Sequence, residues 1–309
     1  MNKIKIVEVG LRDGLQNESS DLSVEQRYDL YSKLSDAGIR NIEIGAYVSP
    51  KWVPQMAVTP ELCSIILSEN RKCRSKVSPS VLVPNEQGML SAIDAGLEEV
   101  AIFAACSESF SQKNTNCSID ESFKRFIPVM KLAKEHGIKV RGYLSTCFSC
   151  PYEGPIPEKK VIKIAKRMYD LGVYEVSIGD TIGVATPGQV TSLFKNLKKL
   201  ISVKELAGHF HDTRGLALAN ILAAFEVGVT TFDSSIGGLG GCPYAPGAAG
   251  NVATEDVVYM FDGMKVKSGV KLDRLIEANR WLQPLMNHPL SSKVGRVGKL
   301  VPLGKVTGM

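Results

Sequence analysis

This chain of 309 residues has few histidines, an odd number of cysteines and no long apolar run, and each shortage excludes a class of protein. Its seven cysteines show no framework spacing, so they favour a reducing compartment over a secreted disulfide scaffold. No segment approaches the ~18 consecutive apolar residues of a membrane span. A strand-like pattern begins at Lys3 and leaves no room for a signal or transit peptide. We therefore expect a cytoplasmic protein without a membrane partner.

Clusters of one charge are also missing. The net charge is +5, and the densest basic segment, 158-EKKVIKIAKR-167, has the spacing of a solvated helix face. We therefore expect no nucleic-acid partner, whereas an acidic small substrate is compatible with this balance. Hydrophobic residues make up 44% of the chain, which is ample for a large core.

The chain does contain a repeated local pattern, in which a helix-like segment ends in glycine and a β-rich run begins at once. The five copies are 36-DAGIRNIEI-44, 94-DAGLEEVAI-102, 135-EHGIKVRGYL-144, 170-DLGVYEVSI-178 and 226-EVGVTTFDS-234. Glycine closes a last helical turn in the left-handed conformation, so each copy predicts a helix-to-strand corner. Three further strands are predicted at 3-KIKIVEVG-10, 77-VSPSVLV-83 and 205-ELAGHFH-211.

Eight strands that alternate with helices predict an α/β fold, a (β/α)₈ TIM barrel. A doubly wound sheet would carry a nucleotide-binding fingerprint after its first strand, but 10-GLRDGLQ-16 lacks the G-x-G-x-x-G spacing. Beyond the eighth strand we predict additional C-terminal helices at 254–264, with Thr254 as N-cap, and at 272–286, and a loop-like tail at 291–304. We expect residues 1–309 to form a single barrel domain, with its core at about 3–240 and a helical extension at about 252–309.

Polar residues gather where the predicted strands end. The carboxyl ends of barrel strands meet at one mouth, where the chemistry of such barrels lies. The residues at these ends are Arg12, Asp13, Glu43, Asn85, Ser107, Glu108, Arg141, Tyr143, Asp180, Thr181, His209, His211, Asp212 and Asp233. Any one of them could simply cap a helix, but together they predict an active site at this mouth.

Two of the four histidines lie two residues apart, at His209 and His211. In a strand, side chains at i and i+2 point to the same face, so both imidazoles would project together. They could be hydrogen-bonded core histidines, or they could bind a metal with oxygen ligands from Asp13 and Asn251. Two nitrogens and two oxygens suit Mg²⁺ or Mn²⁺ better than a closed zinc site. A metal-dependent hydrolase would usually place such a pair after its first strand, so that class fits less well.

The segment 237-GGLGGCPYAPGAAGN-251 follows the eighth strand and is rich in glycine. It contains no dinucleotide-binding spacing, and we expect a mobile flap over the barrel mouth. Cys242 lies on this segment. It is either an inert buried thiol or a proton donor, since a thiol with a pKa near ~8.5 stays mostly protonated at neutral pH.

Long phrases of the chain closely resemble the 3-hydroxy-3-methylglutaryl-CoA lyase family. They are 7-VEVGLRDGLQNE-18, 48-VSPKWVPQM-56, 142-GYLSTCFSCPYEG-154, 179-GDTIGVATPG-188, 209-HFHDT-213 and 233-DSSIGGLGGCPYAPGAAGNVATEDVVYM-260, in the family's order, and the similarity covers about residues 3–290. The resemblance implies a barrel with a divalent metal that splits an acyl-CoA substrate into acetyl-CoA and acetoacetate, as in leucine catabolism or ketone body formation. It also implies a homodimer.

The same resemblance assigns roles to individual residues. The implied metal ligands are Asp13, His209, His211 and Asn251. The implied catalytic residues are Arg12, Asp13, Glu43, Asp180, His209 and Cys242, with either Asp13 or His209 as the general base. The implied substrate-binding residues are Arg12, Gln16, Asn114, Tyr143 and Thr181.

The chain departs from the commoner family pattern at several positions. Gly45 and Ala46 stand where Thr and Ser are usual, Arg214 replaces a frequent Tyr, and Ser19 replaces a frequent Lys. The first two changes would remove hydroxyls from the barrel mouth, and Arg214 would add a cation near the metal. They leave open a relative with the same metal site that acts on another acyl-CoA or a 2-oxo acid, as a lyase or as a condensing enzyme.

Overall fold

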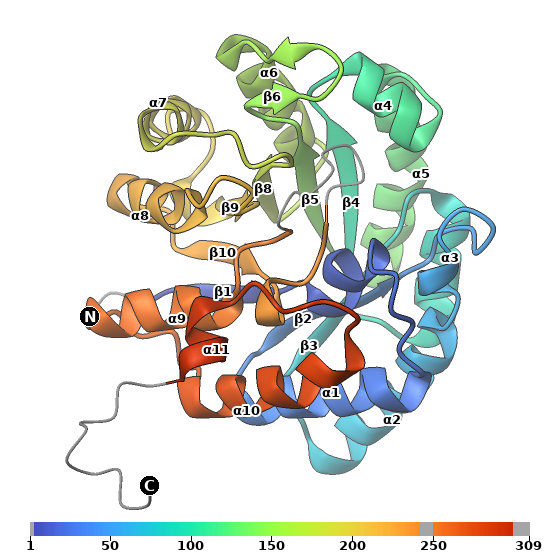
Figure 1. Ribbon diagram of the computed structural model, residues 1–309. Helices are drawn as coiled ribbons and strands as arrows, with labels where there is room; N and C mark the ends of the chain where they lie inside the picture. Colours follow the sequence, from blue (N-terminus) through green and yellow to red (C-terminus); the bar gives the residue numbers. More distant parts are fainter. Residues whose placement is uncertain (1–2, 242–249, 299–309) are drawn as a thin grey trace, which may run out of the picture.

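Eight parallel strands close into a barrel in the computed structural model of the chain, which describes residues 3–241 and 250–298 (Figure 1). The strands are β1 (Lys5–Glu8), β2 (Asn41–Ala46), β3 (Ser78–Leu82), β4 (Glu99–Ala105), β5 (Lys139–Ser145), β8 (Glu175–Asp180), β9 (Leu206–Phe210) and β10 (Thr231–Ser234). Their order around the barrel is β1-β10-β9-β8-β5-β4-β3-β2. A short antiparallel pair, β6 (Ser149–Cys150) and β7 (Gly154–Pro155), follows β5. The predicted TIM barrel is confirmed.

Helices surround this barrel (Figure 1). They are α1 (Val24–Ala37), α2 (Thr59–Cys73), α3 (Glu86–Ala95), α4 (Glu108–Thr115), α5 (Ile119–His136), α6 (Glu158–Asp170), α7 (Pro187–Leu197), α8 (Ala217–Val227), α9 (Thr254–Gly263), α10 (Leu272–Leu282) and α11 (Lys293–Val297). The described part of the chain also contains five short helical turns: η1 (Gly10–Gly14), η2 (Pro54–Met56), η3 (Val203–Glu205), η4 (Ile236–Gly238) and η5 (Gln283–Leu285). Within residues 3–241 and 250–298, no helix is long and apolar enough to cross a membrane.

The predicted helix-to-strand corners are present. All five glycines of the repeated pattern have positive φ, and those of Gly38 and Gly228 are 101° and 113°. Their amides bond to the carbonyls that end α1 and α8, which closes each helix one turn before the next strand. Because the eight barrel strands all pair in parallel, their carboxyl ends lie at one mouth.

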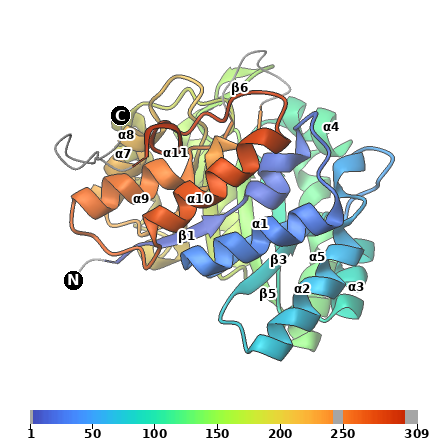
Figure 2. The same cartoon turned by 60° about the horizontal axis from the view of Figure 1, so that its bottom comes forward.

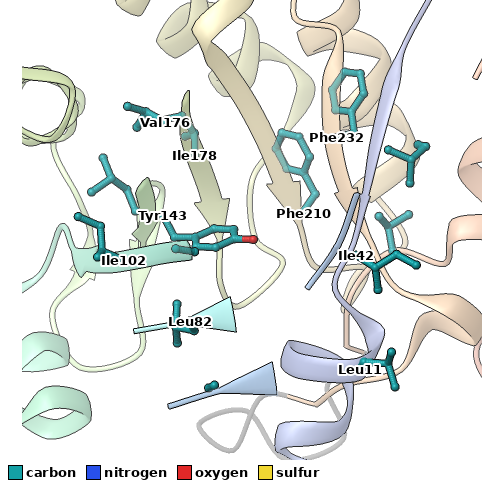
Figure 3. Packing of buried hydrophobic residues seen from close by; sticks show 14 of the residues in the cluster. Leu11, Ile42, Leu82, Ile102, Tyr143, Val176, Ile178, Phe210 and Phe232 are labelled. Carbon is teal, nitrogen blue, oxygen red and sulfur yellow. The ribbon is translucent and has the colours of Figure 1, made fainter. Parts of the chain in front are cut away.

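Apolar side chains fill the space around the strands. Ile102, Val176 and Phe232 are fully buried, and Figure 3 shows them with other members of the core cluster. The ring of Phe232 stacks on Phe261 of α9, with 5.8 Å between the ring centroids. This packing ties the C-terminal helices to the barrel strands.

The C-terminal extension begins at α9, and α10 packs along α1 (Figure 2). Two details differ from the sequence prediction. Thr254 does not cap α9, because Ala253 takes the N-cap position and the Thr254 hydroxyl donates to the buried Glu8 carboxylate at 2.6 Å. The tail is not entirely loop-like, because α11 forms where Asp256 accepts the amide of Val294 at 2.8 Å.

Candidate active site

Arg12 lies at the barrel mouth in η1, directly after β1. Its side chain is buried, and it forms two ion pairs of 2.6 Å, from Nε to Glu43 Oε2 and from Nη1 to Asp13 Oδ1. Burial lowers the pKa of Arg12, but the charges of Glu43 and Asp13 outweigh this and raise it above its usual value. The guanidinium is therefore a permanent cation, held in one orientation by a carboxylate from the next strand.

Tyr143 on β5 reaches the Arg12–Glu43 ion pair from the other side of the barrel. Its hydroxyl lies 3.4 Å from Glu43 Oε2, and its ring lies 5.4 Å from the Arg12 guanidinium carbon. Figure 3 shows the ring extending into the barrel interior, away from its own strand. The pKa of Tyr143 is raised well above its usual value, first by burial and then by the charge of Glu43. Tyr143 is therefore a neutral hydrogen-bond donor.

Asp13, His209 and His211 form a cluster with the geometry of a metal site. Each offers one ligand atom, and these atoms all lie within 4.8 Å of one another. Asp13 Oδ2 is 3.8 Å from Nε2 of both histidines, because the imidazoles project from the same face of β9 and its end. Burial raises the pKa of Asp13, but Arg12 and the two histidines hold it well below its usual range. A charged oxygen thus faces two imidazole nitrogens, which is a suitable donor set for a divalent cation.

Asn251, the fourth predicted ligand, joins this cluster from the far end of the glycine-rich loop. It is 2% exposed and forms an isolated bridge with His211. Its Nδ2 donates to Asp13 Oδ2 at 2.8 Å, so its carboxamide lies against the same carboxylate. All four predicted ligands are brought together, although they come from three separate parts of the chain.

Asp233 on β10 orients one of these histidines, a role that the sequence did not assign. Its Oδ2 lies 3.2 Å from His209 Nδ1 and accepts the Ser177 hydroxyl at 2.6 Å. Arg141 Nη2 lies 2.8 Å from Asp233 Oδ1, an ion-pair contact without hydrogen-bond alignment. Burial raises the pKa of Asp233, but Arg141 and His209 bring it down to about 2. A charged carboxylate at Nδ1 leaves the Nε2 lone pair of His209 directed at the cluster.

Strand register could have revealed Asp233. It is paired with His209 between β10 and β9, so the two side chains are neighbours on one face. The sequence placed both residues at strand ends but gave no register between the strands. Arg141 was also noted only as a polar strand residue, and it ion-pairs with both Glu175 and Asp233 inside the barrel.

Asp180 and Thr181 lie at the mouth but already have backbone partners. The two carboxylate oxygens of Asp180 accept the amides of Val184 and Ala185 at 3.0 and 2.9 Å. Thr181 Oγ1 accepts the amide of Thr146 at 2.8 Å. Burial raises the pKa of Asp180 above its usual value. Both side chains thus shape the loops after β8 and β5.

Two of the remaining predicted residues differ in exposure. Gln16 is half-buried just after η1, and Asn114 is exposed on α4. Cys242 and most of the predicted flap lie outside the described residues.

Of the two positions at which β2 departs from the common family pattern, not both face the barrel mouth. A Cβ added at Gly45 would lie 2.5 Å from Thr59 Oγ1, so this position faces α2. The Thr59 hydroxyl donates to Met56 O at 2.8 Å and accepts the Ala46 amide at 3.2 Å. The expectation that Gly45 removes a hydroxyl from the mouth is therefore wrong. The side chain of Arg214 is held by the backbone, since its Nη1 donates to the carbonyls of residues 182 and 183 at 3.1 Å each.

Comparisons with known proteins agree with this geometry. The HMGL-like family model matches residues 3–282. Hydroxymethylglutaryl-CoA lyase of Pseudomonas mevalonii is 51% identical over 277 residues, which cover 90% of each chain. The 3-hydroxy-3-isohexenylglutaryl-CoA/hydroxy-methylglutaryl-CoA lyase of Pseudomonas aeruginosa is 45% identical, over 95% of this chain and 96% of its own.

Solved structures give the same result. The structure of an HMG-CoA lyase from Acinetobacter baumannii, in complex with coenzyme A and 3-methylmalate, superposes with a TM-score of 0.91 at 35% identity. The match covers 97% of this chain and 98% of that one. The barrel, the cluster at its mouth and these similarities lead to one conclusion: the chain belongs to the HMGL-like family.

Proposed function

We propose that this chain is a divalent-metal-dependent carbon–carbon lyase that cleaves 3-hydroxy-3-methylglutaryl-CoA into acetyl-CoA and acetoacetate. The observation that carries the proposal is the cluster of Asp13, His209 and His211 beside the Arg12–Glu43 ion pair. The chain has this cluster while being 51% identical to a hydroxymethylglutaryl-CoA lyase. A non-catalytic relative is less well supported, because scaffolding would need neither Arg12 nor Glu43 in the interior. A condensing enzyme is less well supported, because the similar proteins are lyases.

Asp13, His209, His211 and Asn251 would hold the cation. Their carboxylate and amide oxygens and neutral imidazoles suit Mg²⁺ or Mn²⁺, with room left for substrate oxygens. When bound, such an ion acidifies the substrate hydroxyl and orients it. Asp233 prepares His209 for this task, because in the neutral imidazole it favours the tautomer with the proton on Nδ1, which leaves Nε2 available to a cation.

The reaction then requires three actions from the chain's own residues. A base removes the proton of the tertiary hydroxyl, a step of the kind worth roughly 10²- to 10⁴-fold in rate. Of the two candidates, Asp13 and His209, Asp13 fits better, because Nε2 of His209 would be held by the cation and its Nδ1 faces Asp233. The carbon–carbon bond breaks, its electron pair passes to the thioester as an enolate, and acetoacetate forms. The Arg12 guanidinium stabilises the developing charge on the thioester oxygen, and Glu43 keeps it in that orientation. Cys242 donates a proton to the enolate carbon and yields acetyl-CoA.

A coupled assay for acetoacetate from 3-hydroxy-3-methylglutaryl-CoA tests the proposal. We expect formation of acetoacetate with added Mg²⁺ or Mn²⁺, loss of activity after chelation, and recovery when either ion is restored. Full activity without any divalent ion would contradict the metal role. Absence of acetoacetate with either ion would contradict the substrate.

We also propose that the protein acts in the cytoplasm as a homodimer, in leucine degradation or ketone body formation. Residues 1–309 would form one catalytic unit, with the loop at 237–251 as a flap over the substrate. Light scattering after size-exclusion chromatography tests the dimer, with a molar mass near twice the 33.5 kDa of the chain as the expected result.

A further inference from the structure

A contact far from the barrel strands joins the C-terminal extension to the active-site mouth. The segment at 287–292, between η5 and α11, lies against residues 18–20, which follow η1. His288 Nε2 lies 2.7 Å from Glu18 Oε2, and Asn287 Nδ2 donates to Ser19 Oγ at 2.7 Å. Two adjacent residues of this segment thus contact two adjacent residues near the mouth.

Only one of these two contacts continues toward the proposed metal site. Glu18 is 6% exposed at its side chain, and its second oxygen, Oε1, accepts the Gly240 amide at 3.2 Å. Gly240 belongs to the glycine-rich segment, on the side that leads away from η4. Glu18 therefore links His288 to the start of that loop, whereas Ser19 makes no such link within residues 3–241 and 250–298.

Gly240 packs directly against Asn251, one of the proposed metal ligands. It has φ of +114°, and a Cβ there would lie 2.9 Å from Asn251 Nδ2. The preceding residue, Leu239, accepts a hydrogen bond from the same nitrogen at 3.2 Å. That nitrogen also donates to Asp13 Oδ2 at 2.8 Å. The backbone of Leu239 and Gly240 thus fixes the plane of the Asn251 amide relative to Asp13.

We propose that Glu18, held by His288, is a positioning residue for the metal site. It fixes the Leu239–Gly240 backbone and, through it, the carboxamide of Asn251. The inference rests on the proposed metal site and adds to it two residues that contact neither metal nor substrate. A carboxylate is suited to this task because one oxygen can accept from the Gly240 amide while the other accepts from the imidazole.

The alternative is that the contact only fastens the C-terminal segment. Both roles predict some loss of thermal stability, so stability alone does not separate them. Metal affinity does, because partners that orient a ligand typically contribute 10- to 100-fold to it. The probe is Mn²⁺ binding to the metal-free full-length protein, measured by electron paramagnetic resonance of free Mn²⁺ without substrate.

We expect Glu18→Ala to weaken Mn²⁺ binding by about 10-fold. Glu18→Gln keeps an acceptor for the Gly240 amide and should restore most of the affinity. The matched control is Asn287→Ala, which removes the side-chain bond to Ser19 between the same segments, keeps the bond from the residue 287 amide to Ser20 Oγ, and does not touch Gly240. It should change Tm without changing the Mn²⁺ affinity.

Two results would overturn the proposal: Mn²⁺ affinity within twofold of wild type in Glu18→Ala, or an equal loss of affinity in Asn287→Ala. If Glu18→Ala does not fold, His288→Ala decides, because its side chain is 44% exposed and its removal leaves the core intact. We expect His288→Ala to bind Mn²⁺ several-fold more weakly than wild type. An unchanged Mn²⁺ affinity would refute the role of His288 and Glu18 in positioning Asn251. Wild-type protein that binds Mn²⁺ but forms no acetoacetate would contradict the proposed function alone.

Discussion

Replacement of Asp233 by Asn tests how the chain prepares His209 for a cation. The carboxylate accepts from Ser177 and faces His209 Nδ1 with one oxygen, and it meets Arg141 with the other. An Asn side chain can copy only half of this arrangement. If its oxygen faces His209, its NH₂ group points at the Arg141 guanidinium. If its NH₂ group faces His209, the imidazole must carry its proton on Nε2, where the metal would bind.

Either orientation weakens metal binding. Loss of a partner that orients a metal-ligating histidine typically costs 10- to 100-fold in affinity, or about 1.4 to 2.7 kcal/mol. The substitution also removes one of two carboxylates that face buried Arg141, and breaking a buried ion pair costs up to ~3–5 kcal/mol of stability. Asp233→Asn should therefore lower both Mn²⁺ affinity and Tm.

Glu175→Gln provides the matched control. Glu175 Oε1 accepts from Arg141 Nε at 2.8 Å and is as buried as Asp233, but it does not contact His209. It should lower Tm and leave Mn²⁺ affinity unchanged. Calorimetric titration of both metal-free variants with Mn²⁺ separates the two effects. Wild-type affinity in Asp233→Asn, or an equal loss in both variants, would refute the reasoning.

Three further predictions follow from other parts of the site. Arg12→Gln should lower kcat by ~10²- to 10³-fold with little change in KM, because the guanidinium acts on charge that develops during the reaction; an unchanged kcat in steady-state assays would remove this role. Cys242→Ser should bind Mn²⁺ as wild type does but lose nearly all turnover in the acetoacetate assay. Full activity in this variant would contradict the role of Cys242 as proton donor. Burial raises the pKa of Glu8 to about 7 and that of Glu255 to about 8, from 4.5. Their stabilising effect is therefore complete below about pH 4.5 and is lost as the pH rises through 7 and 8, with a slope of up to about 1.4 kcal/mol per pH unit for each proton. Urea unfolding of Glu255→Gln between pH 5 and 8 should give a shallower slope than wild type, and an equal slope would contradict the assignment.

Some features of the site could be predicted because their cause is local. The H-x-H spacing on a strand places His209 and His211 on one face whatever the rest of the fold does. Asp13 and Asn251 were predictable through the family phrases that contain them, and the structure brings both to the histidines. Gly45 was misinterpreted because the direction of its missing side chain depends on a register shift in β2, after Glu43, and on Thr59 of a separate helix.

The sequence by itself determined most of the barrel, since five helix-to-strand corners are each specified within about nine residues by a glycine and the apolar pattern around it. It also determined which residue types reach the mouth, because strand ends are set by the same local pattern. Tertiary structure alone decided the supporting contacts: Asp233 behind His209, and Glu18 between His288 and Gly240. These contacts join residues 24 to 270 positions apart, and their geometry depends on strand register and on the path of the C-terminal segment. Neither is encoded in any short stretch of the chain, which is the physical reason that only the folded molecule reveals them.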